Sequence, residues 1–443
     1  MGDTNTLQRS LTPLMLWGLG VGYVISGMYF GWNLGLEKGG TLGMAVATAF
    51  VAFMYVGFTL AYAELSCAIP NAGGVFIYTN RAFGKHLGFV AGIAQMVEFI
   101  FAPPAIAFAI GAYLHTFIPD VPILGIAIIA YLLFTALNIY GIKAAASFET
   151  LVTILAVGEL LLFSALALPH FEWANLQHQS LPNGWGGMLA AIPFAIWFFL
   201  GIEGIANVAE ETPNPQRAIS RGFGASMATL LLLCLLVFVS AVGVGGWETI
   251  VYKNGISGET SDSPLPLALL HVLGDSHPMY HLLITVGVFG LVASFHGLIL
   301  AAGRSTYEMG KVRQLPAALG SVSERFHTPA NALLFNMILG IAALLTGKTA
   351  EIITISVFGA LSLYILAIFA MLRLRHTEPQ LARPFTTPLY PLLPVAASLI
   401  ALVALIALFV YNVGLGLLYI GIVLGALGLF SILGNNKSID KDI

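Results

Sequence analysis

Long apolar segments return at short intervals along almost the whole chain. A membrane-crossing helix needs about 20 mostly apolar residues, and twelve segments come near or exceed that length. They lie near residues 13–36, 41–67, 85–117, 122–141, 148–169, 185–210, 222–246, 279–309, 329–346, 350–374, 389–411 and 413–434. Only 9% of the residues are charged, against about 25% in soluble domains. The sequence therefore predicts an all-α integral membrane protein with twelve transmembrane helices.

Positive charges alternate between the connections of these segments. One set holds fifteen of the eighteen Lys and Arg residues, whereas the alternate set holds only Lys38, Lys253 and Lys348. Cytoplasmic loops carry the excess of Lys and Arg, so we expect a cell (inner) membrane protein with cytoplasmic tails at 1–12 and 435–443. No cleavable signal peptide is expected, because the short polar start runs directly into a long apolar segment. The net charge of −3 does not suggest a nucleic acid partner.

Two of the segments contain glycine-rich interruptions. Segment 13–36 carries Ser26 and Gly27 among several glycines, and segment 185–210 carries Glu203 between Gly201 and Gly204. Unwound backbone in a membrane helix is tolerated only where it is buried in protein or lines a cavity. Broken helices at matching positions are typical of transporters with two inverted repeats. We expect a ten-helix transport core at 13–374, with repeats 13–169 and 185–374, and two further helices at 389–434.

Ionisable residues deep inside the segments are acidic apart from one histidine. Glu98, Glu159, Glu203 and His296 lie there, and no Lys or Arg lies at comparable depth. An intramembrane ionisable residue is a functional hypothesis by default, and this interior favours a cation or a proton. We predict that Glu98 contacts an ammonium group, with a structural hydrogen bond as the alternative. Glu203 either contacts the same group or caps backbone amides that the interruption frees.

The remaining polar residues have both a functional and a structural interpretation. Glu159 either carries a coupling proton or is a buried neutral carboxyl, and His296 either packs in the core or takes part in transport. Ser294 is a candidate sodium ligand. Three acids near helix ends are expected to be structural, solvated or paired with Lys143 and Arg304: Glu64, Glu149 and Glu308.

Aromatic side chains flank both interruptions. The face of an aromatic ring attracts an ammonium group by about 0.5 to 2 kcal/mol, although aromatic residues also fill membrane helices in general. The candidate coupling residues are Glu159 and Ser294. The candidate substrate-binding residues are Tyr23, Ile25, Ser26, Gly27, Tyr29, Glu98, Trp197, Phe199, Gly201, Ile202, Glu203 and His296.

Four stretches are similar to motifs of the amino acid–polyamine–organocation superfamily. They are 25–30, 63–66 with 69–74, 201–203 with 210–217, and 302–305 with 314–316 and 328–331. The resemblance covers the first nine segments in order. It implies a leucine-transporter-like 5+5 inverted repeat with discontinuous helices 1 and 6, alternating access, and closure of Trp197 over the substrate from outside.

Within that superfamily, residues 22–33 most resemble the bacterial ethanolamine permeases. The first glycine of the superfamily's span-one motif is Ile25 here, which argues against binding a substrate carboxylate at that position. Glu159 falls where several proton-coupled relatives carry Lys, and this implies a place for the coupling proton.

These observations predict a secondary transporter that imports a small cationic or zwitterionic amine, with ethanolamine as the leading substrate and protons, or else sodium, as the coupling ion. An amino acid permease for neutral or cationic amino acids is the alternative. A membrane enzyme would need paired acids or histidines at one membrane surface, and the acids here lie at mid-depth in different segments. No cofactor or metal is expected, because Cys67 and Cys234 lie in apolar segments and the histidines lack a helical ligand pattern.

Overall fold

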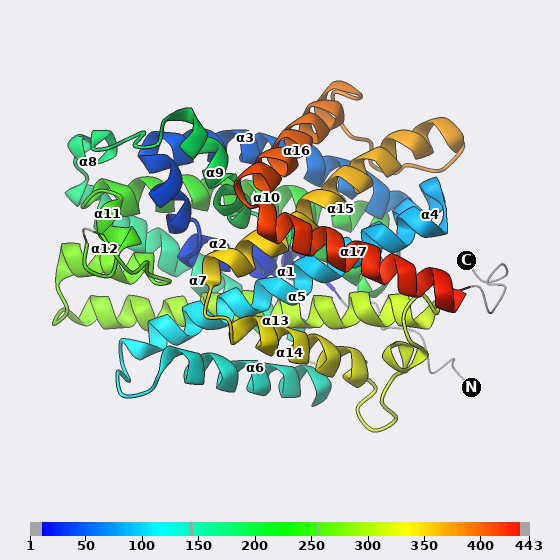
Figure 1. Cartoon of the computed structure of the whole chain (residues 1–443), viewed down its shortest axis with the longest axis horizontal. Helices are drawn as coiled ribbons and strands as arrows, with labels where there is room; N and C mark the ends of the chain where they lie inside the picture. The colour runs from blue at the N-terminus through cyan, green and yellow to red at the C-terminus, as the bar shows by residue number, and fades with distance from the viewer. Residues whose placement is uncertain (1–10, 141–144, 256, 435–443) are drawn as a thin grey trace.

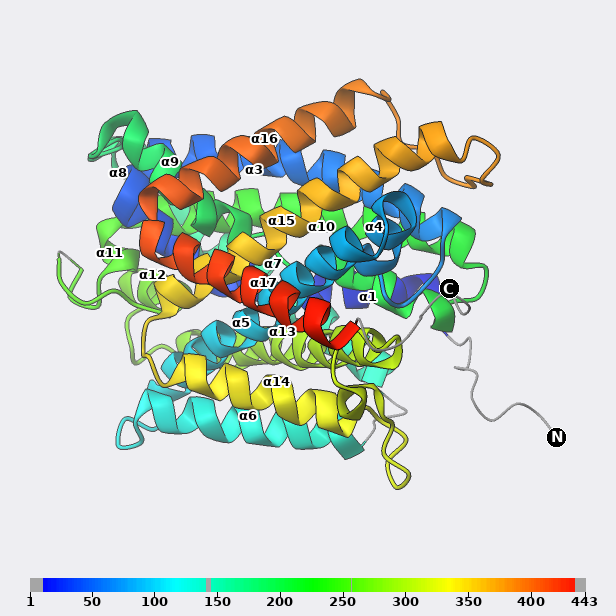
Figure 2. The ribbon, with the colours of Figure 1, turned by 45° about the vertical axis from the view of Figure 1, so that its right-hand side comes forward.

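The computed structural model describes residues 11–140, 145–255 and 257–434, which form a bundle of helices packed along a common axis (Figures 1 and 2). Ten segments of the described chain are long and apolar enough to cross a membrane. They are α3 (Asn33–Ala68), α5 (Lys85–His115), α6 (Ile123–Tyr140), α7 (Ala145–Ala167) with η1 (Leu168–His170), α9 (Gly184–Trp197) with η2 (Ile202–Glu211), α10 (Pro215–Gly243), α13 (Pro278–Lys311), α15 (Thr349–Thr377), α16 (Leu392–Tyr411) and α17 (Val413–Gly434). The described residues contain no β-strand, and the all-helical membrane fold is confirmed.

Two shorter helices stand where the first and ninth segments are predicted, namely α1 (Pro13–Val24) and α14 (Ala330–Leu344). Each of the twelve predicted segments thus coincides with a helix, while the count of twelve spans and the inverted repeat remain predictions. Predicted tail residues 1–10 and 435–443, together with Lys143, lie outside the described residues. The other short elements are α2 (Ser26–Tyr29), α4 (Val75–Phe83), α8 (Trp173–Gln177), α11 (Glu248–Val251), α12 (Pro264–Leu273) and η3 (Ala317–Gly320).

The first predicted segment is divided in the structure. Helix α1 ends at Val24, and α2 continues only to Tyr29. Phe30 is then extended, and Gly31 has a φ of +86°, which favours glycine. The structure therefore shows the interruption that the sequence predicts, but its extended part follows α2 and lies downstream of Ser26 and Gly27.

A buried asparagine holds this extended part in place. The side-chain oxygen of Asn33 accepts a hydrogen bond from the backbone N–H of Gly31 at 3.0 Å. The side-chain nitrogen of Asn33 donates to the carbonyl oxygen of Ser261 at 2.8 Å. Asn33, which is fully buried, thereby ties the interruption to the long connection between α10 and α13.

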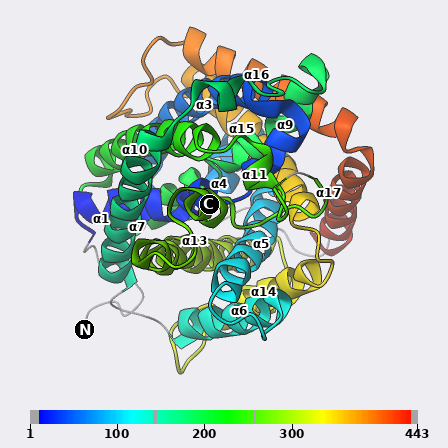
Figure 3. The ribbon, with the colours of Figure 1, turned by 90° about the vertical axis from the view of Figure 1, so that its left-hand side faces the viewer.

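Helix α5 forms the centre of the bundle. It packs against α4, α6, α13, α14, α15 and α17, and 94% of its most apolar stretch is buried, against 17% for α17. The end-on view shows α16 and α17 at the periphery, with α6 and α14 on another side (Figure 3). Side chains on α5 therefore point into protein in every direction.

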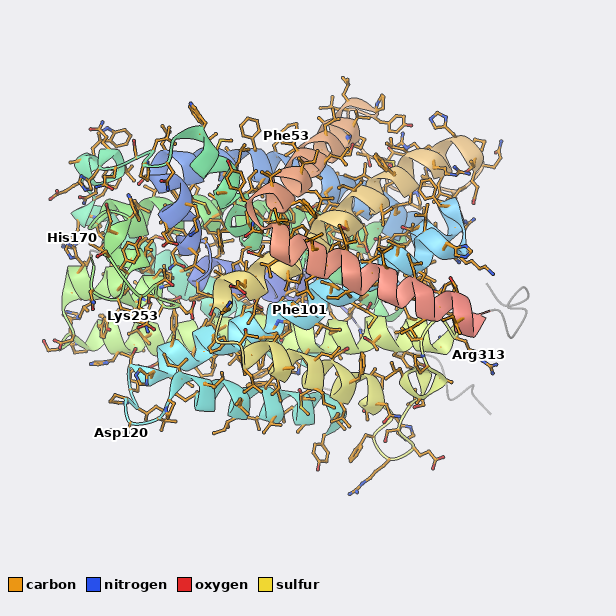
Figure 4. All side chains as sticks on the ribbon, viewed as in Figure 1. Phe53, Phe101, Asp120, His170, Lys253 and Arg313 are labelled. Atoms are coloured by element: carbon orange, nitrogen blue, oxygen red, sulfur yellow. The ribbon has the colours of Figure 1, made fainter. Side chains whose placement is uncertain are left out.

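Charged side chains gather at the two ends of the bundle. Arg313 lies at one end, and Asp120 and Lys253 lie at the other (Figure 4). The exposed Phe53 lies on the outer surface near α16. We call the end that holds Arg313 and Arg375 the basic end; it is the end that the distribution of Lys and Arg predicts to be cytoplasmic.

A buried carboxylate joins three segments at the basic end. Glu64, near the end of α3, accepts a hydrogen bond from Arg375 Nε at 2.8 Å and lies 3.5 Å from Arg383. The backbone N–H of Thr387 donates to the same carboxylate at 2.7 Å. Glu64 therefore connects α3, the last turn of α15 and the segment that leads to α16.

Glu64→Gln should lower stability markedly, because it removes the negative charge and leaves two arginines facing each other. Breaking a buried pair costs about 3–5 kcal/mol, and we expect the lower part of that range because both arginines keep some contact with water. The measurement is the apparent melting temperature of the purified protein in detergent. Glu351→Gln is the control, since Glu351 pairs with Lys348 on the surface and such pairs contribute little. Equal melting shifts for the two variants would contradict this prediction.

Candidate functional site

Two carboxyl groups from distant parts of the chain meet at the second interruption. Helix α9 ends at Trp197, and the backbone turns through Gly201, whose φ of +98° is left-handed, into η2. Glu203 on η2 and Glu98 on α5 are both fully buried. Their carboxyl groups lie within hydrogen-bonding reach of each other. The sequence predicts both residues, and the structure brings them together.

Two tyrosines complete this group. The hydroxyl of Tyr364 on α15 lies 3.4 Å from a carboxyl oxygen of Glu98 and 3.4 Å from one of Glu203. The hydroxyl of Tyr55 on α3 lies 2.9 Å from that of Tyr364, and Phe199 packs on the Tyr55 ring at 5.2 Å. Sequence reasoning missed both tyrosines, because nothing distinguishes them from other aromatic residues of apolar segments.

The charge of the acid pair, Glu98 and Glu203, is not compensated by the protein. None of the ion pairs in the described part of the chain includes either residue. One oxygen of each carboxyl group, Glu98 Oε2 and Glu203 Oε1, has no hydrogen-bond partner among the described residues. Two adjacent negative charges in apolar surroundings repel strongly, so the pair requires a shared proton or a bound cation. The described residues hold no group of three or more His, Cys, Asp or Glu side chains placed to bind a metal ion.

A hydroxyl group from α13 interrupts the first segment. The backbone N–H of Ser26 donates to Ser294 Oγ at 2.9 Å, and Ser294 Oγ donates to the carbonyl of Gly22 at 2.6 Å. In an uninterrupted α-helix, Ser26 would donate directly to Gly22, so the hydroxyl is inserted into that bond. Ile25 is buried and helical, and its N–H donates to Val21. The amides of Ile25 and Ser26 are therefore already engaged.

The two interruptions touch each other through glycines. A Cβ on Gly27 would overlap the carbonyl oxygen of Trp197, and one on Gly204 would come within 2.8 Å of the Tyr23 ring. Small residues permit this close approach of backbones. The indole of Trp197 packs edge-on against Phe30 at 5.4 Å, and its N–H finds no partner among the described residues. Ile202 is fully buried where η2 begins.

Glu159 lies at a separate place, against the other end of α2. Its carboxylate accepts a hydrogen bond from the Tyr29 hydroxyl at 2.7 Å. The Tyr113 hydroxyl donates to the backbone carbonyl of Tyr29 at 3.0 Å. The polar contacts of Tyr29 are thus with Glu159 and its neighbours, and they connect helix α7 to the interrupted first segment.

His296 and Glu149 form a third buried group. His296 Nδ1 lies 3.6 Å from Glu149 Oε2, and their side chains are only 6% and 2% exposed. The expectation that Glu149 is solvated is wrong, because α7 packs against α1 and α13 and encloses it. The described polar contact of the His296 ring is with Glu149, and not with the acid pair.

Comparison with known proteins agrees with this architecture. The family model for amino acid permeases matches residues 11–427. Similar proteins include an uncharacterized transporter of Rhizobium meliloti, 28% identical over 88% of this chain and 84% of its own. The branched-chain amino acid permease of Bacillus subtilis is 26% identical over 88% and 85% of the two chains. The serine/threonine exchanger of the same bacterium is 26% identical over 88% and 89%. The chain thus belongs to the amino acid permease family, within the amino acid–polyamine–organocation superfamily.

Proposed function

We propose that this transporter imports a small organic amine across the cytoplasmic membrane by alternating access, with ethanolamine as the leading substrate. The observation that carries the proposal is the acid pair. Glu98 and Glu203 are buried side by side at the second interruption, and no described ion pair neutralises them. An ammonium group between the two carboxyl groups would supply the missing positive charge.

The surroundings of the acid pair favour an amine without a carboxylate. A primary ammonium has three hydrogen-bond donors, which the free oxygens of the two acids and the hydroxyl of Tyr364 can accept. A substrate carboxylate would instead need backbone N–H groups at the first interruption. Three of those N–H groups, on Ile25, Ser26 and Gly31, are occupied by Val21, Ser294 and Asn33.

Glu98→Gln and Glu203→Gln should each weaken amine binding by about ten- to a hundredfold, because a hydrogen bond to a charged group contributes about 1.5–3 kcal/mol. Binding is measured as the ethanolamine-dependent rise in melting temperature, and transport as uptake of labelled ethanolamine by proteoliposomes. Glu351→Gln serves as the control, since it makes the same chemical change on a surface residue. Wild-type affinity in Glu98→Gln would show that Glu98 does not recognise the ammonium group.

A neutral or cationic amino acid is the alternative substrate. It is supported by the relatives, whose names include a branched-chain amino acid permease and a serine/threonine exchanger. Competition against labelled ethanolamine separates the two proposals. We expect unlabelled ethanolamine to compete strongly and alanine, serine and lysine to compete weakly. Choline, which lacks N–H donors, tests whether the hydrogen-bond donors of a primary ammonium are needed. Stronger competition by an amino acid than by ethanolamine would favour the alternative.

We further propose that protons drive this import and that Glu159 carries the coupling proton. Glu159 is buried and bonded to Tyr29 on α2, so a change in its charge acts directly on the interrupted segment. Sodium is less well supported. The candidate sodium ligand, Ser294, already donates one hydrogen bond and accepts another.

Glu159→Gln should abolish accumulation driven by a pH gradient, because the amide cannot release a proton. Exchange of labelled for unlabelled amine should continue, since it requires no net proton movement. Tyr29→Phe is the comparison variant, which keeps the carboxyl group but removes its hydrogen bond and should therefore retain part of the coupling. Intact pH-driven accumulation in Glu159→Gln would exclude Glu159 as the proton carrier.

A further inference from the structure

Five polar atoms without hydrogen-bond partners lie close to the acid pair. Among the described residues, these five atoms without such a partner are both amide atoms of Gln95, both amide atoms of Asn207 and the hydroxyl of Tyr62. These side chains are 1%, 2% and 0% exposed. The backbone N–H of Val75 lies near the Tyr62 hydroxyl, but none of the five atoms has a well-formed partner among the described residues. Buried polar groups are nearly always hydrogen-bonded. Three buried side chains that lack hydrogen-bond partners come together here from three separate elements. They therefore indicate a site where a bound polar ligand supplies the missing hydrogen bonds.

The three side chains converge on one glycine. A Cβ placed on Gly74 would lie 2.9 Å from the Tyr62 hydroxyl, 3.2 Å from Asn207 Oδ1 and 3.6 Å from Gln95 Nε2. Gly74 has a φ of +55° and a ψ of −131°, a conformation that is essentially restricted to glycine. Because glycine has no side chain, the polar atoms of Tyr62, Gln95 and Asn207 face the backbone of Gly74, just before α4.

This cluster lies beside the acid pair on the side of the basic end. Gln95 comes three residues before Glu98 on α5, which begins near the basic end at Lys85. Asn207 comes four residues after Glu203 on η2, which leads back towards the same end. Gln95 therefore lies about one turn from Glu98, and Asn207 lies about one turn from Glu203. Both are displaced towards the basic end.

Tyr62 lies in the same direction from the acid pair. It is seven residues after Tyr55 on α3, and the rings of Phe58 and Tyr62 continue the aromatic contacts from Tyr55 at 6.3 and 5.2 Å. Helix α3 then reaches Glu64 and its arginines at the basic end. The three polar side chains thus lie between the acid pair and the surface that is predicted to be cytoplasmic.

We propose that Gln95, Asn207 and Tyr62 form a second binding station, at which the ammonium group of the substrate is held by uncharged oxygen atoms after it leaves the acid pair. A primary ammonium donates three hydrogen bonds, and the station contains three acceptor oxygens, Gln95 Oε1, Asn207 Oδ1 and the Tyr62 hydroxyl. Gln95 turns its Nε2 towards Gly74, so its amide presents Oε1 to the cation after a half-turn about its terminal bond. Moving the cation directly from two carboxylates into an apolar passage would be very unfavourable. Uncharged acceptors keep it solvated yet bind it less tightly than the acids, which allows release.

The station rests on the proposed function, because it takes the same amine substrate as the acid pair. The test combines Gln95→Met with Tyr62→Phe in the full-length protein and measures two quantities on the same preparation. Amine binding to the acid pair, measured by thermal shift with ethanolamine, should stay near wild type. Uptake of labelled ethanolamine into proteoliposomes should fall by about tenfold or more, which corresponds to a lost hydrogen bond to a charged group.

Tyr78→Phe is the matched control for the lost hydroxyl. The Tyr78 ring contacts that of Tyr62 at 5.5 Å, but its hydroxyl already donates to Ser66 at 3.2 Å. We expect wild-type uptake for this control. If the double variant also transports at the wild-type rate, the station is overturned, and the polar atoms then serve only water or packing. If the wild-type protein neither binds nor transports any amine, the proposed function fails and the station fails with it.

A glycine pair provides a second test that does not depend on removing polar groups. Gly74→Ala would place a methyl group among the three polar side chains, whereas Gly84→Ala meets nothing within 4 Å. Both glycines have positive φ, 55° and 87°, so both variants carry backbone strain. Slow uptake with retained binding in Gly74→Ala alone supports the station. Equal uptake in the two variants contradicts it.

Discussion

Backbone groups inside a bilayer have no water to bind, so every helix that opens must find partners within the protein. The interrupted first segment shows how this chain meets the requirement. The Ser294 hydroxyl takes the place of the missing bond between Ser26 and Gly22, and the Asn33 side chain receives the N–H of Gly31. Ser294 lies on α13, far along the chain, whereas Asn33 is a close neighbour of Gly31, so a distant side chain and a local one together satisfy the opened backbone.

The lack of water inside the bilayer also constrains the charge of the acid pair. Glu98 and Glu203 are brought together by the packing of η2 on the bundle, and the tyrosines around them are shared with α3 and α15. Because the bilayer excludes solvent, the negative charge of this pair requires a proton or a bound cation. In the proposed function, the ammonium group of the substrate supplies that positive charge.

Much of the architecture could be predicted from the sequence. Membrane helices are apparent from the length of apolar runs, and both interruptions from glycines beside polar residues. Glu98 and Glu203 could also be identified, since carboxyl groups in apolar segments are rare. Tyr55, Tyr364 and the station residues could not, because tyrosines and amides in such segments are ordinary until their neighbours are known. The burial of Glu149 is hidden from the sequence for a related reason, because the position of a residue along a segment does not reveal which helices cover it.

Three properties can be read from the amino-acid sequence alone: an all-helical membrane fold, interruptions in the first and sixth segments, and an acidic interior. Each of these follows from local composition, which acts over a few residues. Other relations become apparent only in the folded protein: the two acids share one site, Glu159 contacts Tyr29, His296 faces Glu149, and uncharged amides face Gly74. Those relations depend on helix packing, which joins residues far apart in the chain and is not encoded in any single segment.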